Sequence, residues 1–101
     1  MGFKHTPAPW VAAEFLDGFN IKDEKYGKHI AFTPKQNNAQ LIAAAPELLE
    51  ALQSIQQSMA KYIEVANNIG VEALADGFYL GHAIDVEEKA RQAIEKALGQ
   101  Q

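Results

Sequence analysis

The feature that most constrains this chain is an apolar stripe on one face of a predicted helix between residues 45 and 69. Its members follow one another at alternating spacings of three and four: Ala45, Leu48, Leu52, Ile55, Met59, Tyr62, Ala66 and Ile69. This spacing matches the 3.6-residue period of an α-helix, so these side chains share one face. The pattern predicts a long amphipathic helix that must cover its apolar face against something else.

Pro46 lies at the start of that stripe. Inside a helix, a proline removes the hydrogen bond to the carbonyl group four residues earlier, here that of Ile42, and its ring clashes there. In the first turn of a helix, a proline is well tolerated. The sequence therefore predicts a short helix at about 38–45, a break or kink, and a long helix at about 46–68.

Residues 10–33 are predicted to form a three-stranded antiparallel meander. Phe19 and Ile21 alternate with polar residues, as in a strand with one buried face. Gly27 suits the positive φ of a hairpin loop. The third strand is expected to place Ile30 and Phe32 on the same inner face as Ile21. Such a sheet has one apolar face and needs helices to cover it.

The C-terminal part is predicted to hold a loop at 77–81 and a last helix from Asp85 to Leu98. Asp85 and Glu88 have the spacing of a capping box. The apolar stripe expected on this helix is Val86, Ala90, Ala93 and Ala97, with Ile94 and Leu98 alongside. Small side chains let a neighbouring helix approach closely, so the last helix is expected to form an antiparallel hairpin with the long one.

These elements predict an α+β fold in a single domain, residues 1–101, with a β-rich part at 1–36 and a helical part at 37–101. A chain of 101 residues fits one domain. Its 48% apolar and 22% charged residues are typical of a folded protein.

Composition and motifs exclude several classes of function. The net charge of −4 gives no reason to bind nucleic acid, and the chain has no cysteine. No apolar run is long enough to span a membrane. The three histidines have no metal-ligand spacing, and no phosphate-binding or nucleophile motif is present. We expect no enzymatic activity, no metal and no cofactor.

The remaining candidates are interaction residues. Phe78 and Tyr79 lie in the predicted loop, where aromatic side chains can anchor a partner. For Phe78 the favoured interpretation is that it plugs the end of the helical hairpin together with Leu80, and for Tyr79 both interpretations stay open. Trp10 either seals the rim of the sheet or stacks on a ligand, and the first interpretation is favoured.

The long helix carries more large apolar side chains than the sheet and an alanine-rich helix can cover. Each such side chain left in water forgoes roughly 1.5–3 kcal/mol of burial. We therefore predict a homodimer through the long helix, with Leu52, Ile55, Met59 and Tyr62 at the contact. The alternative is a monomer in which the sheet and both helices form a closed core.

Two segments resemble a known family. The run His5-Thr6-Pro7-Ala8-Pro9-Trp10 resembles the His-Thr-Pro-Gly-Pro-Trp opening of many small phage and prophage proteins, with Ala8 in place of the usual glycine. Residues 38–52, Asn-Ala-Gln-Leu-Ile-Ala-Ala-Ala-Pro-Glu-Leu-Leu-Glu-Ala-Leu, are similar to the most recognisable segment of the same proteins. The resemblance implies a phage origin and action in the cytoplasm of a bacterial host cell. It brings no catalytic residues.

Together these observations favour a phage accessory protein that acts by binding a host protein, for example a component of a defence system. The alternative is a protein that binds or sequesters a small ligand such as a nucleotide signal, in a pocket between protomers.

Overall fold

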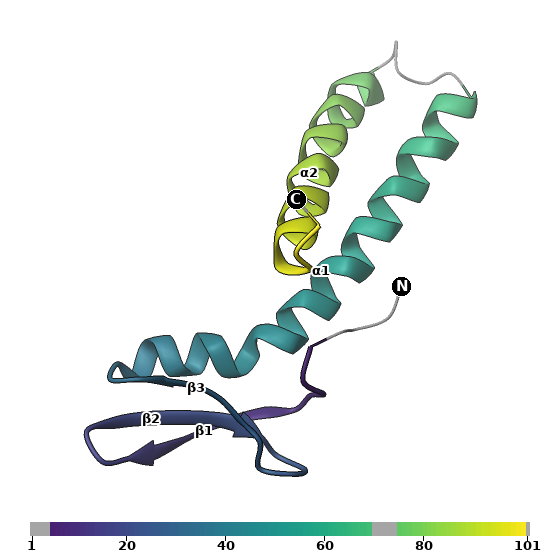
Figure 1. The fold of residues 1–101 in the computed structure, drawn as a ribbon. Helices are drawn as coiled ribbons and strands as arrows, with labels where there is room; N and C mark the ends of the chain where they lie inside the picture. Colours follow the sequence, from purple (N-terminus) through teal and green to yellow (C-terminus); the bar gives the residue numbers. More distant parts are fainter. Residues whose placement is uncertain (1–4, 70–74, 101) are drawn as a thin grey trace. The chain divides into compact units, whose positions relative to one another are not determined.

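The structure is a computed structural model that describes residues 5–69 and 75–100, and the side chains of these residues except those of 75–79. Its elements, in chain order, are β1 (Trp10–Phe15), β2 (Gly18–Asp23), β3 (His29–Thr33), α1 (Gln36–Ile69) and α2 (Ala75–Ala97) (Figure 1). The three strands form one antiparallel sheet in the order β1-β2-β3. The predicted α+β class is therefore confirmed, with a meander followed by a long helix and a C-terminal helix.

The contacts within the chain divide it into two units, Met1–Leu48 and Leu49–Gln101. The first unit holds the sheet and the first turns of α1, and the second holds the rest of α1 together with α2. Each unit is described below by itself.

The core of the first unit is built around Ile21 at the centre of the sheet. Ile21 is fully buried, and its neighbours across the two ladders are Ala12 and Ala31. Ala39, in the first turns of α1, is also buried. These turns lie over the sheet (Figure 1). Small side chains around Ile21 allow the close approach of helix and sheet that buries it.

The expected inner face of the third strand is wrong. Ala31 and Thr33 share a face with Ile21, whereas Phe32 pairs with Asn20 on the opposite face and is half exposed. The register shifts between Ile21 and Lys22, which pair with Ala31 and His29, so Ile30 is the extra residue of a β-bulge. The prediction assumes that side chains alternate strictly between the two faces of the strand. A β-bulge breaks this alternation.

Of the predicted break or kink at Pro46, the break does not occur, because α1 is one helix from Gln36 to Ile69 with Pro46 inside it, and the kink stays a prediction. Pro46 is buried in the first unit. Inside a helix, the lost backbone hydrogen bond and the steric clash of a proline cost about 3 kcal/mol. In a helix of 34 residues this local penalty is offset by the packing of the turns on either side.

In the second unit, α2 begins at Ala75, so the predicted loop at 77–81 and the predicted helix start at Asp85 are both wrong. Gly77 and Gly81 lie inside the helix, where each costs about 1 kcal/mol relative to alanine. Asp85 is an exposed residue of the helix interior rather than its cap.

The side of α2 that is covered differs from the predicted stripe. Its buried side chains are spaced by three, seven and four: Leu80, Ala83, Ala90 and Ile94. Ala93 and Ala97 are exposed, and Val86 is half-buried. The predicted stripe does not include Leu80, because the prediction starts the last helix after it, at Asp85.

Glu87 lies in the same seam, between Ala83 and Ala90, and makes a polar contact with α1. Its side chain is only 15% exposed, and its Oε2 accepts a hydrogen bond of 2.6 Å from Nε2 of Gln56 on α1. The Nε of Arg91 lies 3.5 Å from the same oxygen. The carboxylate is therefore partnered within the unit, as a charge at such a position must be.

The turn between β1 and β2 contains a residue under backbone strain. Phe15 pairs with Gly18, so Leu16 and Asp17 form a two-residue turn, and Leu16 has a φ of 53°. Side chains with a Cβ pay roughly 1–2 kcal/mol in this region, and turns of this kind place glycine there.

Leu16→Gly is therefore expected to raise the free energy of unfolding by about 0.5–1 kcal/mol, since the relieved strain exceeds the extra entropy of the unfolded glycine. Urea unfolding followed by Trp10 fluorescence measures the change. Asp17→Gly is the control, because Asp17 has no positive φ. A stabilisation by the control as large as that by Leu16→Gly would contradict the strain argument.

Candidate interaction surfaces

An exposed apolar ribbon runs along α1 in the second unit. We call it the α1 ribbon and define it by six residues at spacings of four and three: Ala51, Ile55, Ser58, Tyr62, Val65 and Ile69. All six are exposed, and the exposed fractions of the four large ones are 55% for Ile55, 47% for Tyr62, 46% for Val65 and 68% for Ile69. Single exposed apolar residues are ordinary, but a continuous row of them marks a contact surface.

The stripe predicted from the sequence is divided between two faces of α1. Leu52 and Met59 are half-buried and Ala66 is buried, whereas Ile55 and Tyr62 are exposed. The hydrogen bond from Gln56 to Glu87 shows which side of α1 faces α2. The α1 ribbon therefore contains two of the predicted contact residues, Ile55 and Tyr62, and adds the row beyond them.

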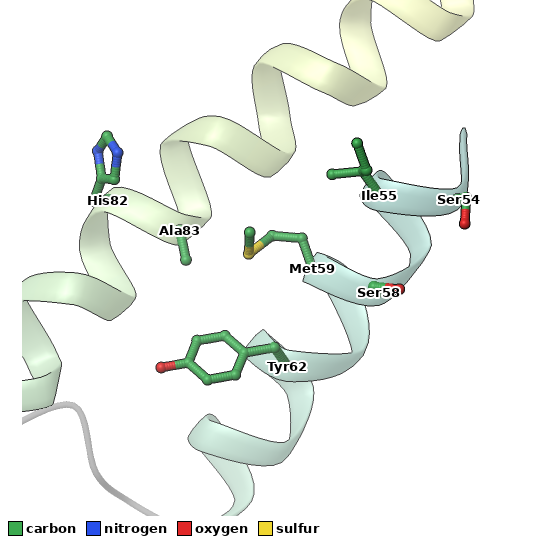
Figure 2. Close-up of a pocket in the computed structure, with 7 residues that line it drawn as sticks. All are labelled: Ser54, Ile55, Ser58, Met59, Tyr62, His82 and Ala83. Atoms are coloured by element: carbon green, nitrogen blue, oxygen red, sulfur yellow. The ribbon is translucent and has the colours of Figure 1, made fainter. Parts of the chain in front are cut away.

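A hollow of about 530 Å³ opens where the α1 ribbon meets α2. Its lining residues are Ser54, Ile55, Ser58, Met59, Tyr62, His82 and Ala83. Figure 2 shows Met59 and Tyr62 projecting from α1 on the side of Ala83. We call this the α1–α2 hollow. Its lining has no lysine or arginine, so it suits an apolar group better than a phosphate.

A second exposed apolar surface lies on the first unit, on the side of the sheet opposite Ile21. We call it the outer sheet patch and define it by Phe15, Leu16 and Phe32, whose exposed fractions are 50%, 87% and 49%. Phe15 pairs with Gly18, and the ring of Phe32 lies over the same glycine. The two aromatic side chains thus flank Gly18, with Leu16 at the adjoining turn.

The other predicted interaction residues are not part of these surfaces. Trp10 is half-buried at the start of β1, and its Nε1 donates a hydrogen bond of 2.9 Å to the Thr6 carbonyl. This is the geometry of a residue at the rim of the sheet, and stacking on a ligand stays a prediction. The side chains of Phe78 and Tyr79 lie outside the described residues.

The described residues offer no group of three or more histidine, aspartate or glutamate side chains that could hold a metal ion. Among the same residues, no buried side-chain nitrogen or oxygen lacks a hydrogen bond partner. No helix within the described ranges is long and apolar enough to cross a bilayer. The α1 ribbon and the outer sheet patch remain as candidate contact surfaces.

The fold and these surfaces define an α+β chain with a meander, a helical hairpin and exposed apolar contact faces. A model of the family described as Salmonella phage P22 protein Y8K6 matches residues 1–101, and the chain belongs to this family. The phage resemblance read from the sequence is confirmed at this level. Comparisons with curated proteins and with solved structures found no match.

Proposed function

We propose that this phage-family protein acts by binding a host protein, without catalysis, and that the outer sheet patch is the contact. One form of this proposal is that the host protein belongs to a defence system. The observation that supports it most directly is the exposure of Phe15 and Phe32 on one side of the sheet, with Leu16 exposed at the adjoining turn.

The chemistry of the patch suits a protein partner. Aromatic side chains dominate the binding energy of protein interfaces because they bury large apolar areas at a low entropic cost. The ring of Phe32 covers Gly18, which has no side chain of its own, so the two aromatic rings lie close to the sheet. Leu16 is held at positive φ, and residues held in strained conformations tend to cluster at binding sites.

The small-ligand alternative would use the α1–α2 hollow. The volume of about 530 Å³ lies within the range of ligand pockets, roughly 300–1,000 Å³. A nucleotide would bring charged phosphates to a lining whose ionisable groups are His82 and the Tyr62 hydroxyl. The hollow therefore favours an apolar occupant, and nucleotide binding remains the less supported function.

The test is affinity capture from a lysate of a host bacterium, with the purified chain as bait. We expect a host protein that is retained by the wild type and lost with Phe15→Thr, which removes an exposed ring and keeps a residue suited to strands. Tyr26→Thr is the matched control, because Tyr26 is an exposed aromatic residue in the other hairpin loop, 69% exposed against 50% for Phe15. Capture of the same protein by all three baits would contradict the assigned patch, and the absence of any specific capture would contradict the function.

A further inference from the structure

The α1 ribbon has the sequence spacing of a coiled-coil seam. Its six positions repeat at four and three, the spacing that lets one helix pack along another with side chains interlocked. The neighbouring seam of α1, with Leu52, Met59 and Ala66, is at least half covered within the unit. Within the second unit, the seam with Leu52, Met59 and Ala66 is covered, and the α1 ribbon remains exposed.

The α1–α2 hollow has the form of a receptor for a side chain from a facing helix. Four of its lining residues, Ile55, Ser58, Met59 and Tyr62, stand at i, i+3, i+4 and i+7 along α1. Four residues at this spacing form the hole into which a knob from a partner helix inserts. Ser58 is the small member of the four and leaves room for a large knob.

The α1 ribbon is complementary, in the size of its side chains, to a second copy of itself that runs antiparallel. In an antiparallel pair centred near residue 60, Ser58 faces Tyr62 and Ala51 faces Ile69 of the other copy, while Ile55 faces Val65. Each small residue then meets a large one, and the two medium residues meet each other. Tyr62 of each copy is placed to enter the hole around Ser58 of the other.

The charges of the chain also favour self-pairing at this surface. A two-fold contact brings each residue near its own copy, so like charges on the surface repel. The chain has a net charge of −4, yet none of the six ribbon residues is charged. Lys61 flanks the ribbon and lies 3.9 Å from Glu64 of its own helix, so its charge has an intrachain counterion.

The area available is sufficient for an association. The ribbon extends over 19 residues, about 28 Å of helix, and two adjacent helices are roughly 20 Å wide. On α2, Val86 and Ala93 continue the side that His82 and Ala83 present to the hollow, because they follow at helical spacings. The footprint is on the order of 500 Å² per copy, so about 1,000 Å² in total, the lower range of specific interfaces.

We infer that the α1 ribbon and the α1–α2 hollow bind a second copy of this chain in an antiparallel two-fold arrangement, giving a four-helix bundle from two hairpins. The contact differs from the one predicted from the sequence, since Leu52 contributes to the hairpin, Met59 contributes to both the hairpin and the hole, and Ala51, Ser58, Val65 and Ile69 are added. This inference is independent of the outer sheet patch, which lies on the first unit.

Light scattering after size exclusion, over about 5–200 µM, tests the association. We expect a mass approaching twice the 11.1 kDa of one chain at the upper concentrations. Ser58→Glu places two like charges in the contact and should raise the dissociation constant roughly tenfold or more. Gln57→Glu is the matched control, with the same charge change at an exposed neighbouring position outside the ribbon, and should leave the mass at that of a dimer.

A thiol cross-link tests the orientation, because the chain has no cysteine of its own. A mixture of Ile55→Cys and Val65→Cys chains, treated with a short bis-maleimide, is expected to give a mixed dimer, while each variant alone stays largely uncross-linked. Circular dichroism checks that every variant is folded, and the cross-link decides the matter if Ser58→Glu is not. A monomer mass at all concentrations, a dimer unaffected by Ser58→Glu, equal loss with Gln57→Glu, or cross-linking only within each variant would overturn the inference.

Discussion

Asp23→Ala is expected to lower the free energy of unfolding by about 3 kcal/mol, because two hydrogen bonds to a buried carboxylate are lost together. Asp23 is 2% exposed and ends β2. Its Oδ1 accepts the Lys28 N–H, and its Oδ2 accepts the Tyr26 N–H at 3.3 Å. Its backbone pairs with Lys28 and Gly27, so one residue organises the whole loop between β2 and β3.

The measurement is urea unfolding followed by the fluorescence of Trp10, which pairs with Asp23 across the ladder and is the one tryptophan of the chain. Asp23→Asn is the control, since its amide oxygen can replace one acceptor, and about half of the loss is expected. A change within about 0.5 kcal/mol for the alanine variant, the range of inert surface substitutions, would show that the loop does not depend on this side chain.

Gly18→Ala is expected to destabilise the sheet by about 2 kcal/mol, through overpacking against a neighbouring strand. A Cβ at this position would lie 2.5 Å from Cζ of Phe32 and 2.8 Å from the Thr33 carbonyl oxygen. The ring can rotate away, but the carbonyl belongs to the backbone of β3, so the strand itself must shift. Gly18 has no positive φ, so the effect comes from contact rather than backbone strain.

Two companion variants separate the causes of this effect. Phe32→Ala in the Gly18→Ala background should restore only part of the loss, because the carbonyl contact remains, and a double-mutant cycle measures that part. Gly81→Ala is the control of opposite sign. Nothing lies within 4 Å of its added Cβ, and alanine in a helix interior is favoured by about 1 kcal/mol. Equal effects of the two glycine substitutions in chemical denaturation would refute the packing argument.

The sequence predicted those features of the fold that depend on neighbouring residues. The strand from Trp10, the positive φ of Gly27 (72°) and the helical course from about residue 38 to 68 follow from local periodicity and turn chemistry, and the structure has all three. The face of Phe32 depends instead on a bulge opposite Ile21 and Lys22, which no local pattern reports. The path of α1 through Pro46 likewise depends on packing that outweighs a local penalty.

The interaction surfaces were only partly predictable for the same reason. Ile55 and Tyr62 were named because they belong to an apolar stripe, and they are exposed. The stripe alone does not indicate which side of α1 is covered by α2, so the prediction does not include Ser58 and Val65. A second row at heptad spacing, from Ala51 to Ile69, was the signal in the sequence that could have revealed them. The outer sheet patch required the register of β3 before Phe32 could be placed in it.

The contact between Gln56 and Glu87 determines which alignment of the two helices the hairpin adopts. Ala83 and Ala90 in the seam of α2 are alike in size, so sliding α2 by a heptad would bring one alanine to the place of the other at that position. The rest of the seam opposes the slide, because Glu87 would exchange places with Leu80 or Ile94 and would be covered without its amide donor. The Gln56–Glu87 hydrogen bond therefore opposes the sliding of α2 along α1. It also holds Ala83 on the side of Met59 and Tyr62 (Figure 2), so the shape of the hollow depends in part on this hydrogen bond.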